Sequence, residues 1–89
     1  MLVLPADLTR AQASACLQML LQGLRAVDDR ELVVDAGALE RFDSSALAVL
    51  LELRRECVAQ GKRLRIRALP ERLHGLATVY GIEEMLSTA

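Results

Sequence analysis

The chain has 89 residues, of which 53% are hydrophobic and 2% aromatic, and its formal net charge is −1. This composition predicts one globular domain with an aliphatic core, and it excludes a disordered chain and a protein that attracts nucleic acid by its overall charge. The longest apolar run, 46–51, is far shorter than the roughly 20 residues that span a bilayer. We therefore expect a soluble, cytoplasmic protein without direct membrane insertion.

The first part of the chain predicts a strand and then a helix. Met1–Leu4 is a short apolar run stopped by Pro5, as in a strand at a sheet edge. Thr9 and Gln12 have the spacing of a capping box, in which both side chains satisfy backbone N–H groups. An amphipathic helix of about four turns should follow. Its apolar stripe consists of Ala13, Cys16, Leu17, Leu20, Leu21 and Leu24.

The middle of the chain, 31–60, contains a second strand and a second helix. Leu32–Val34 is an apolar run rich in β-branched residues, which is typical of a strand buried on both faces. Asp43 and Ser44 are both good helix caps, so we expect the helix to begin there and Gly61 to end it. Its apolar stripe consists of Ala46, Val49, Leu50, Leu53 and Cys57.

The last part of the chain predicts a third strand and a third helix. In the segment 63–68 aliphatic residues alternate with arginines, which indicates a half-buried strand with a basic outer row. Pro70 fits the first turn of the helix, and Gly81 should terminate it. The apolar stripe of this helix consists of Leu73, Leu76, Ala77 and Tyr80. We expect the tail 82–89 to pack back as a last turn or a short strand.

The order strand, helix, strand, helix, strand, helix predicts an α/β domain. Loops this short favour parallel neighbouring strands joined by right-handed crossovers, with helices covering the sheet. Cys16 and Cys57 fall on apolar helix faces without a CxxC spacing, and His74 is the only histidine. We therefore expect two buried thiols, no metal site and no cofactor.

The sequence contains no recognisable set of catalytic residues. The carboxylates near one end of the predicted sheet have no histidine or cysteine placed to work with them, and no glycine-rich phosphate loop follows a strand. These carboxylates are Glu31, Asp35, Glu40 and Asp43. Ser44 lacks the G-x-S-x-G setting of a hydrolase nucleophile. We therefore do not expect an enzyme.

Ser44 offers a different chemistry as the first residue of the predicted central helix. A hydroxyl there faces several free N–H groups and the positive end of the helix dipole, so an added phosphate would be held locally and would change the charge of a docked surface. The alternative is that Asp43 and Ser44 only cap the helix. Beside them, Leu47, Leu51 and Val58 either pack under neighbouring helices or form a docking surface.

The basic outer row of the third strand, Arg63, Arg65 and Arg67, has two interpretations. The row can meet an acidic partner or lipid head groups. Alternatively, it is the solvated face of an exposed strand, where charge resists aggregation, and this is the commoner meaning of such a row.

The segment Phe42–Leu50, F-D-S-S-A-L-A-V-L, lies between a V-V-D strand and a helix that ends at Gln60–Lys62. In this setting it resembles the signature of the STAS domain family, which is best known from anti-sigma factor antagonists. The resemblance covers nearly the whole chain, and we treat residues 1–89 as one STAS domain. Within the family, the stretch 69–82 is similar to MlaB, the small cytoplasmic subunit of the Mla phospholipid-transport ABC complex.

The resemblance implies a STAS-like single domain without enzymatic activity, in which helices cover a small mixed or parallel sheet. It implies an accessory subunit that binds the cytoplasmic ATPase subunit, MlaF in that complex, and supports its assembly and activity in outer-membrane lipid asymmetry. The protein would then be associated with the inner membrane peripherally, through its partner. The alternative within the family is an anti-sigma factor antagonist switched by phosphorylation of Ser44.

The resemblance also implies the contact residues, because the characteristic hydroxyl of the family falls on Ser44. The partner-binding residues would be Asp43, Ser44, Ser45, Leu47, Leu51 and Arg54. Family members usually open with a β-hairpin, but Met1–Asp7 matches only its second strand, so we expect one strand to be missing and the sheet edge to be open. Ala46 stands where antagonists usually have glycine, which should make the helix start firmly at Ser44.

Overall fold

The computed structural model describes residues 1–82 of the chain. In chain order its elements are β1 (Leu2–Val3), β2 (Asp7–Leu8), α1 (Arg10–Arg25), β3 (Glu31–Asp35), β4 (Arg41–Phe42), α2 (Ser44–Ala59), β5 (Arg63–Arg67) and α3 (Glu71–Val79). This is the predicted α/β succession with two further short strands. The packing predicted for the tail lies, beyond Ile82, outside the described residues. No helix within residues 1–82 has the length and apolar character needed to cross a membrane.

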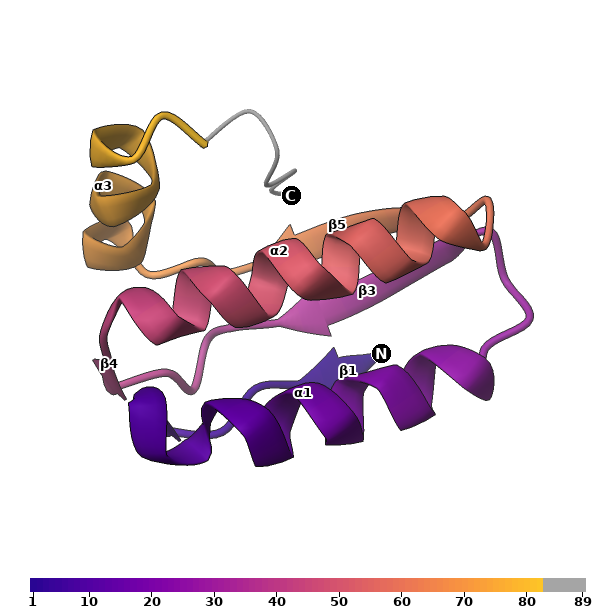
Figure 1. Cartoon of the computed structure of the whole chain (residues 1–89), viewed down its shortest axis with the longest axis horizontal. Helices are drawn as coiled ribbons and strands as arrows, with labels where there is room; N and C mark the ends of the chain where they lie inside the picture. Colours follow the sequence, from indigo (N-terminus) through magenta and orange to yellow (C-terminus); the bar gives the residue numbers. More distant parts are fainter. Residues whose placement is uncertain (83–89) are drawn as a thin grey trace.

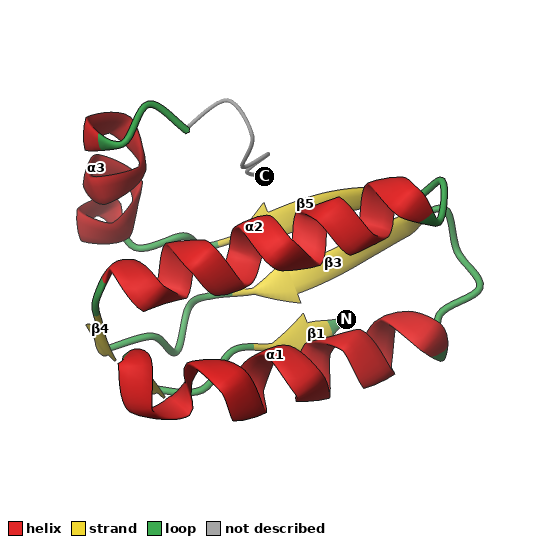
Figure 2. Cartoon of the chain, in the orientation of Figure 1, coloured by secondary structure: helices red, strands yellow, loops and turns green. Residues whose placement is uncertain are grey.

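The three main strands are parallel, as the alternation of strands and helices predicts. They form a sheet of order β1-β3-β5, in which Leu2 lies opposite Val34. A separate parallel pair joins β2 to β4, with Leu8 opposite Phe42. Helices α1 and α2 lie side by side along one face of the main sheet, and α3 lies at the end where β5 finishes (Figure 1, Figure 2).

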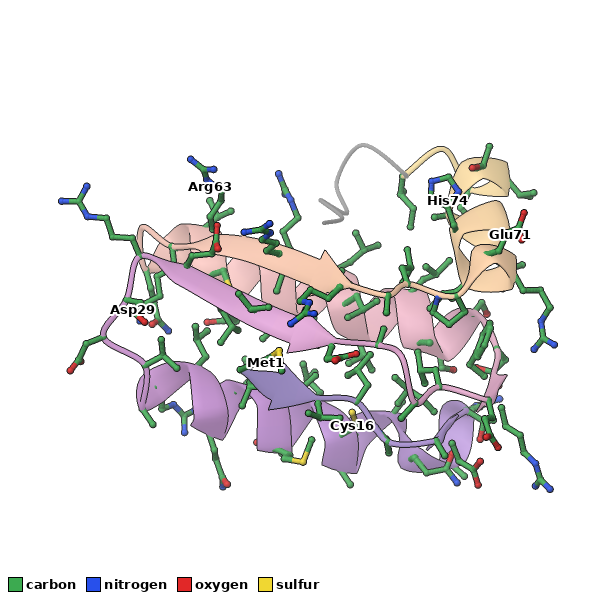
Figure 3. The ribbon with its side chains drawn as sticks, turned by 180° about the vertical axis from the view of Figure 1, so that it is seen from behind. Met1, Cys16, Asp29, Arg63, Glu71 and His74 are labelled. Atoms are coloured by element: carbon green, nitrogen blue, oxygen red, sulfur yellow. The ribbon has the colours of Figure 1, made fainter. Side chains whose placement is uncertain are left out.

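One prediction for β3 is wrong, because α1 and α2 cover only one face of the sheet. Leu32 and Val34 are buried beneath these helices, whereas Val33 is only half-buried on the other face, which Figure 3 shows from its open side. On that face Val33 lies between Glu31 and Asp35. β5 shows the predicted alternation of buried aliphatic side chains and exposed arginines. The sheet is therefore open on one side within the described residues.

The core is built from aliphatic side chains and two thiols, as the composition predicts. Its largest fully buried residues are Leu4, Leu8, Leu20, Leu24, Leu32, Leu50, Leu53, Ile66, Leu73, Val34 and Cys57. No polar or charged residue is buried in the part of the chain that the structure describes. Full burial of a leucine side chain contributes about 1.5–3 kcal/mol. The fold is therefore stabilised by aliphatic packing rather than by buried ion pairs.

Glycine ends the second and third helices, as predicted, but two details of α3 differ from the prediction. Gly61 and Gly81 have φ values of 70° and 71° and follow the caps of α2 and α3. Pro70 is the residue before α3 rather than part of its first turn. Tyr80, which was predicted in the apolar stripe, is 58% exposed because it lies just beyond the last residue of the helix.

Gly23 lies inside α1, where glycine lowers helix stability by roughly 0.5–1 kcal/mol relative to alanine. A Cβ atom at this position would lie 2.6 Å from Cδ2 of Leu2. The absence of a side chain therefore lets α1 approach β1 closely. This packing holds the edge strand against the helix.

Ala68 follows β5 and has a φ of 56°, in the left-handed region that glycine adopts more easily than alanine. We expect Ala68→Gly to raise the free energy of unfolding by about 0.5 kcal/mol. This is the difference between a left-handed strain of about 1 kcal/mol and the additional entropy that glycine loses on folding. Urea denaturation measures the change.

The matched control is Ala38→Gly, at an exposed alanine whose φ is not positive. This substitution adds the entropy cost of glycine without relieving strain, so it should lower the stability. Equal effects of the two substitutions would contradict the assignment of strain to Ala68.

Candidate functional site

The junction between β4 and α2 is organised by the side chain of Asp43. Asp43 is extended, with φ −132° and ψ −166°, and it immediately precedes the first residue of α2. Its Oδ1 accepts a hydrogen bond from the Ser45 N–H group at 2.8 Å. The predicted start of the helix is therefore confirmed, and Asp43 is its N-cap.

The second carboxylate oxygen of Asp43 reaches the other long helix. Its Oδ2 accepts a hydrogen bond at 3.2 Å from the N–H group of Arg10, the first residue of α1. One carboxylate thus accepts hydrogen bonds from the first turns of both α1 and α2. In α1 itself, Gln12 Oε1 accepts from the backbone N–H and the hydroxyl of Thr9, at 2.9 and 2.7 Å.

These hydrogen bonds favour the ionised form of Asp43. The bond from the Ser45 N–H group is the main reason that the pKa of Asp43 lies below its ordinary value of 3.8. The bond from Arg10 lowers the pKa further, and together the two outweigh the effect of desolvation, which raises it. Asp43 therefore carries its negative charge at any pH near neutrality.

Ser44 is exposed and is the first residue of α2, but its surroundings differ from the prediction. The expectation that a group on Ser44 faces several free N–H groups is wrong for the two that follow it. The Ser45 N–H donates to Asp43 Oδ1, and the Ala46 N–H donates to the Asp43 carbonyl at 3.0 Å. A phosphate on Ser44 would therefore compete with Asp43 for donors and meet its negative charge.

The six predicted contact residues occupy different depths. Asp43 and Ser44 are exposed, and Ser45, Leu51 and Arg54 are half-buried. Leu47 is only 2% exposed and belongs to the core, so most of its side chain is out of reach of a partner. The two alternatives for Leu47, Leu51 and Val58, packing inside or forming a docking surface, are therefore decided separately for each residue. Leu47 packs inside, Leu51 lies at the edge, and Val58 is 57% exposed near the far end of the helix.

A shallow apolar groove lies beside Ser44, between α2 and the end of α3. Its walls are formed by Ser44, Leu47, Ala48, Leu51, Tyr80 and Ile82. The groove therefore combines a hydroxyl at one rim, an aliphatic floor and one aromatic ring. Three of these residues, Ala48, Tyr80 and Ile82, were not predicted as site residues, because their approach depends on where α3 packs against α2.

The start of α3 is joined to the same junction by an aromatic contact. The guanidinium carbon of Arg72 lies over the ring of Phe42, 4.6 Å from its centroid. Phe42 is the last residue of β4 and immediately precedes Asp43. This contact was also not predicted, since the two residues are far apart in the sequence and carry no shared pattern.

The remaining reactive groups do not gather at this site. Residues 1–82 contain no group of three or more His, Cys, Asp or Glu side chains that could hold a metal ion. Cys16 and Cys57 are buried and free, and burial is the main reason that the pKa of each thiol is raised. Both therefore stay protonated near neutral pH, as inert core thiols do.

We expect Asp43→Asn to lower the melting temperature at pH 7 by less than about 4 °C, because asparagine is itself a good N-cap. An asparagine side chain has one oxygen acceptor, so it can serve Ser45 or Arg10 but not both. Because the pKa of Asp43 is lowered in the folded state, its ionised form stabilises the fold above about pH 4. This contribution is lost as the pH falls through the folded-state pKa. The difference between variant and wild type should therefore shrink toward pH 3, as thermal unfolding followed by circular dichroism would show.

The control is Asp28→Asn in the exposed turn after α1, which should leave the melting temperature nearly unchanged at each pH. A loss in Asp43→Asn that stays the same from pH 7 to pH 3 would show that the charge and its two hydrogen bonds are not the cause.

The family model described as "Mlab, STAS domain" matches residues 1–87 of the chain. The matched range includes every element from β1 to α3 and the whole junction around Asp43. No curated protein matches the chain.

Proposed function

The chain belongs to the STAS domain family, and from this premise we propose that it is an MlaB-like accessory subunit of a bacterial phospholipid-transport ABC complex. STAS domains are in general non-enzymatic modules that regulate or assist other proteins through contacts. In the proposed role the protein binds the cytoplasmic ATPase subunit, the counterpart of MlaF, and supports its assembly and activity. The description of the matching family model, which names Mlab, supports this choice within the family.

The observation that carries the proposal is the exposed hydroxyl of Ser44 beside an apolar groove. An aliphatic side chain of the ATPase would enter the groove between Leu51 and Tyr80, and a polar group next to it would bond to Ser44. Aliphatic side chains that leave water on docking stabilise a complex in proportion to the area buried. The hydrogen bond at the rim would fix the register of the two surfaces.

The proposed mechanism is a shift in the conformational equilibrium of the ATPase. A subunit that binds one state ten times more tightly than another shifts the equilibrium by about 1.4 kcal/mol. The junction suits this role because Asp43 ties it to both long helices, so little order is lost or gained there on binding. Residence at the inner membrane would follow from the partner, which is itself part of a membrane complex.

We expect Leu51→Glu to weaken binding to the proposed partner, the ABC ATPase subunit, by at least tenfold. The substitution places a charge at the edge of the groove, where it would be desolvated by the docked partner. Isothermal titration calorimetry with the purified ATPase measures the dissociation constant. Ser44→Asp should also weaken binding, because it puts a second carboxylate next to Asp43.

Val58→Glu is the matched control, since it introduces the same charge at an exposed aliphatic residue of the same helix, outside the groove. It should bind within about twofold of the wild type. The proposal fails if the wild type does not bind the ATPase, and the placement of the contact fails if both Leu51→Glu and Ser44→Asp bind normally.

The exposure of Ser44 also allows the second candidate, an anti-sigma factor antagonist switched by phosphorylation. Ala46, which stands where such antagonists usually have glycine, weighs against it, because alanine gives the helix a firmer start next to Ser44. Incubation with an anti-sigma factor kinase and ATP, followed by mass spectrometry, distinguishes the two. Stoichiometric phosphate on Ser44 would favour the antagonist and count against the transport role.

A further inference from the structure

Arg72 is a cation held in a fixed place at the rim of the junction. The central carbon of its guanidinium lies over the ring of Phe42, 4.6 Å from the ring centroid. Arg72 is exposed, and no carboxylate within residues 1–82 forms a salt bridge with it. The stack on Phe42 therefore positions a charge that has no ionic partner in the described part of the chain.

The position of Arg72 is unfavourable for its own helix. It is the second residue of α3, where the free N–H groups and the helix dipole favour negative charge, as Glu71 beside it illustrates. Helix stability thus gives no reason for an arginine here. Departures from local preference of this kind are expected where a residue serves binding.

The location of Arg72 places its charge next to the proposed docking surface. Phe42 lies two residues before Ser44, which limits the distance between their Cα atoms to about 7 Å. The neighbouring carboxylate of Asp43 is already occupied by the N–H groups of Ser45 and Arg10. The donors of Arg72 therefore remain available at the same edge of the molecule as the groove.

We propose that Arg72 is a specificity-determining contact of the docking surface and that the ATPase presents a carboxylate to it. The inference rests on the proposed function and adds the chemistry of the partner surface, which is an acidic side chain next to an aliphatic one. The planar fork of a guanidinium binds a carboxylate through two parallel hydrogen bonds. Because the guanidinium already contacts the ring of Phe42, less side-chain freedom is lost when the partner binds.

The test compares dissociation constants for the ATPase at 50 and 300 mM NaCl. We expect Arg72→Glu to weaken binding at least tenfold at the lower salt concentration and clearly less at the higher one, because salt screens the repulsion. Arg72→Lys should recover part of the affinity, since it keeps the charge but not the fork. Phe42→Leu keeps the charge but frees the guanidinium, so it should cause a smaller loss than Arg72→Glu.

The control is Arg63→Glu, which makes the same charge reversal at the opposite end of the sheet from α3 (Figure 3). It should bind within about twofold of the wild type at both salt concentrations. Normal binding by Arg72→Glu would overturn the inference and leave the proposed function intact. A loss that is equal at both salt concentrations and accompanied by a lower melting temperature would also overturn it, as a structural effect. Failure of the wild type to bind would overturn the proposed function and this inference together.

Discussion

The two hydrogen bonds accepted by the carboxylate of Asp43 are the constraint on which the geometry of the site depends. One oxygen accepts from an N–H group in the first turn of α2, and the other accepts from an N–H group in the first turn of α1. Both helices therefore begin at the same edge of the molecule. A charged acceptor makes these bonds stronger than neutral ones. The two helices lie side by side over one face of the sheet and begin at the same end of it (Figure 1). Ser44, the first residue of α2, is exposed there.

The third helix completes the site from a different direction. Leu73 and Ala77 anchor α3 in the aliphatic core, and Arg72 joins its first turn to Phe42. Only with α3 in this place do Tyr80 and Ile82 face the exposed part of α2 and form a groove with it. The site is thus assembled from three segments, each held by its own packing, around a junction of only a few residues.

Local sequence patterns predict most of the elements, because caps, stripes and terminal glycines act within one or two turns. Examples are Asp43 as the N-cap of α2, Gly61 at the C-terminal end of α2, and the alternation of buried and exposed side chains in β5. The strands β2 and β4 are not predicted, because two residues are too few to show an alternation of apolar and polar side chains. The exposure of Val33, the burial of Leu47 and the contact between Arg72 and Phe42 depend on how elements pack, which no local pattern encodes.

The chain contains one tyrosine, one phenylalanine and no tryptophan. Both rings border the junction, since Phe42 lies beneath Arg72 and Tyr80 lines the groove. The interior, built from leucine, valine and isoleucine, is silent in the near ultraviolet. The phenolic absorbance and emission of the domain therefore originate at the wall of this groove, where they respond to a change in the surroundings of Tyr80.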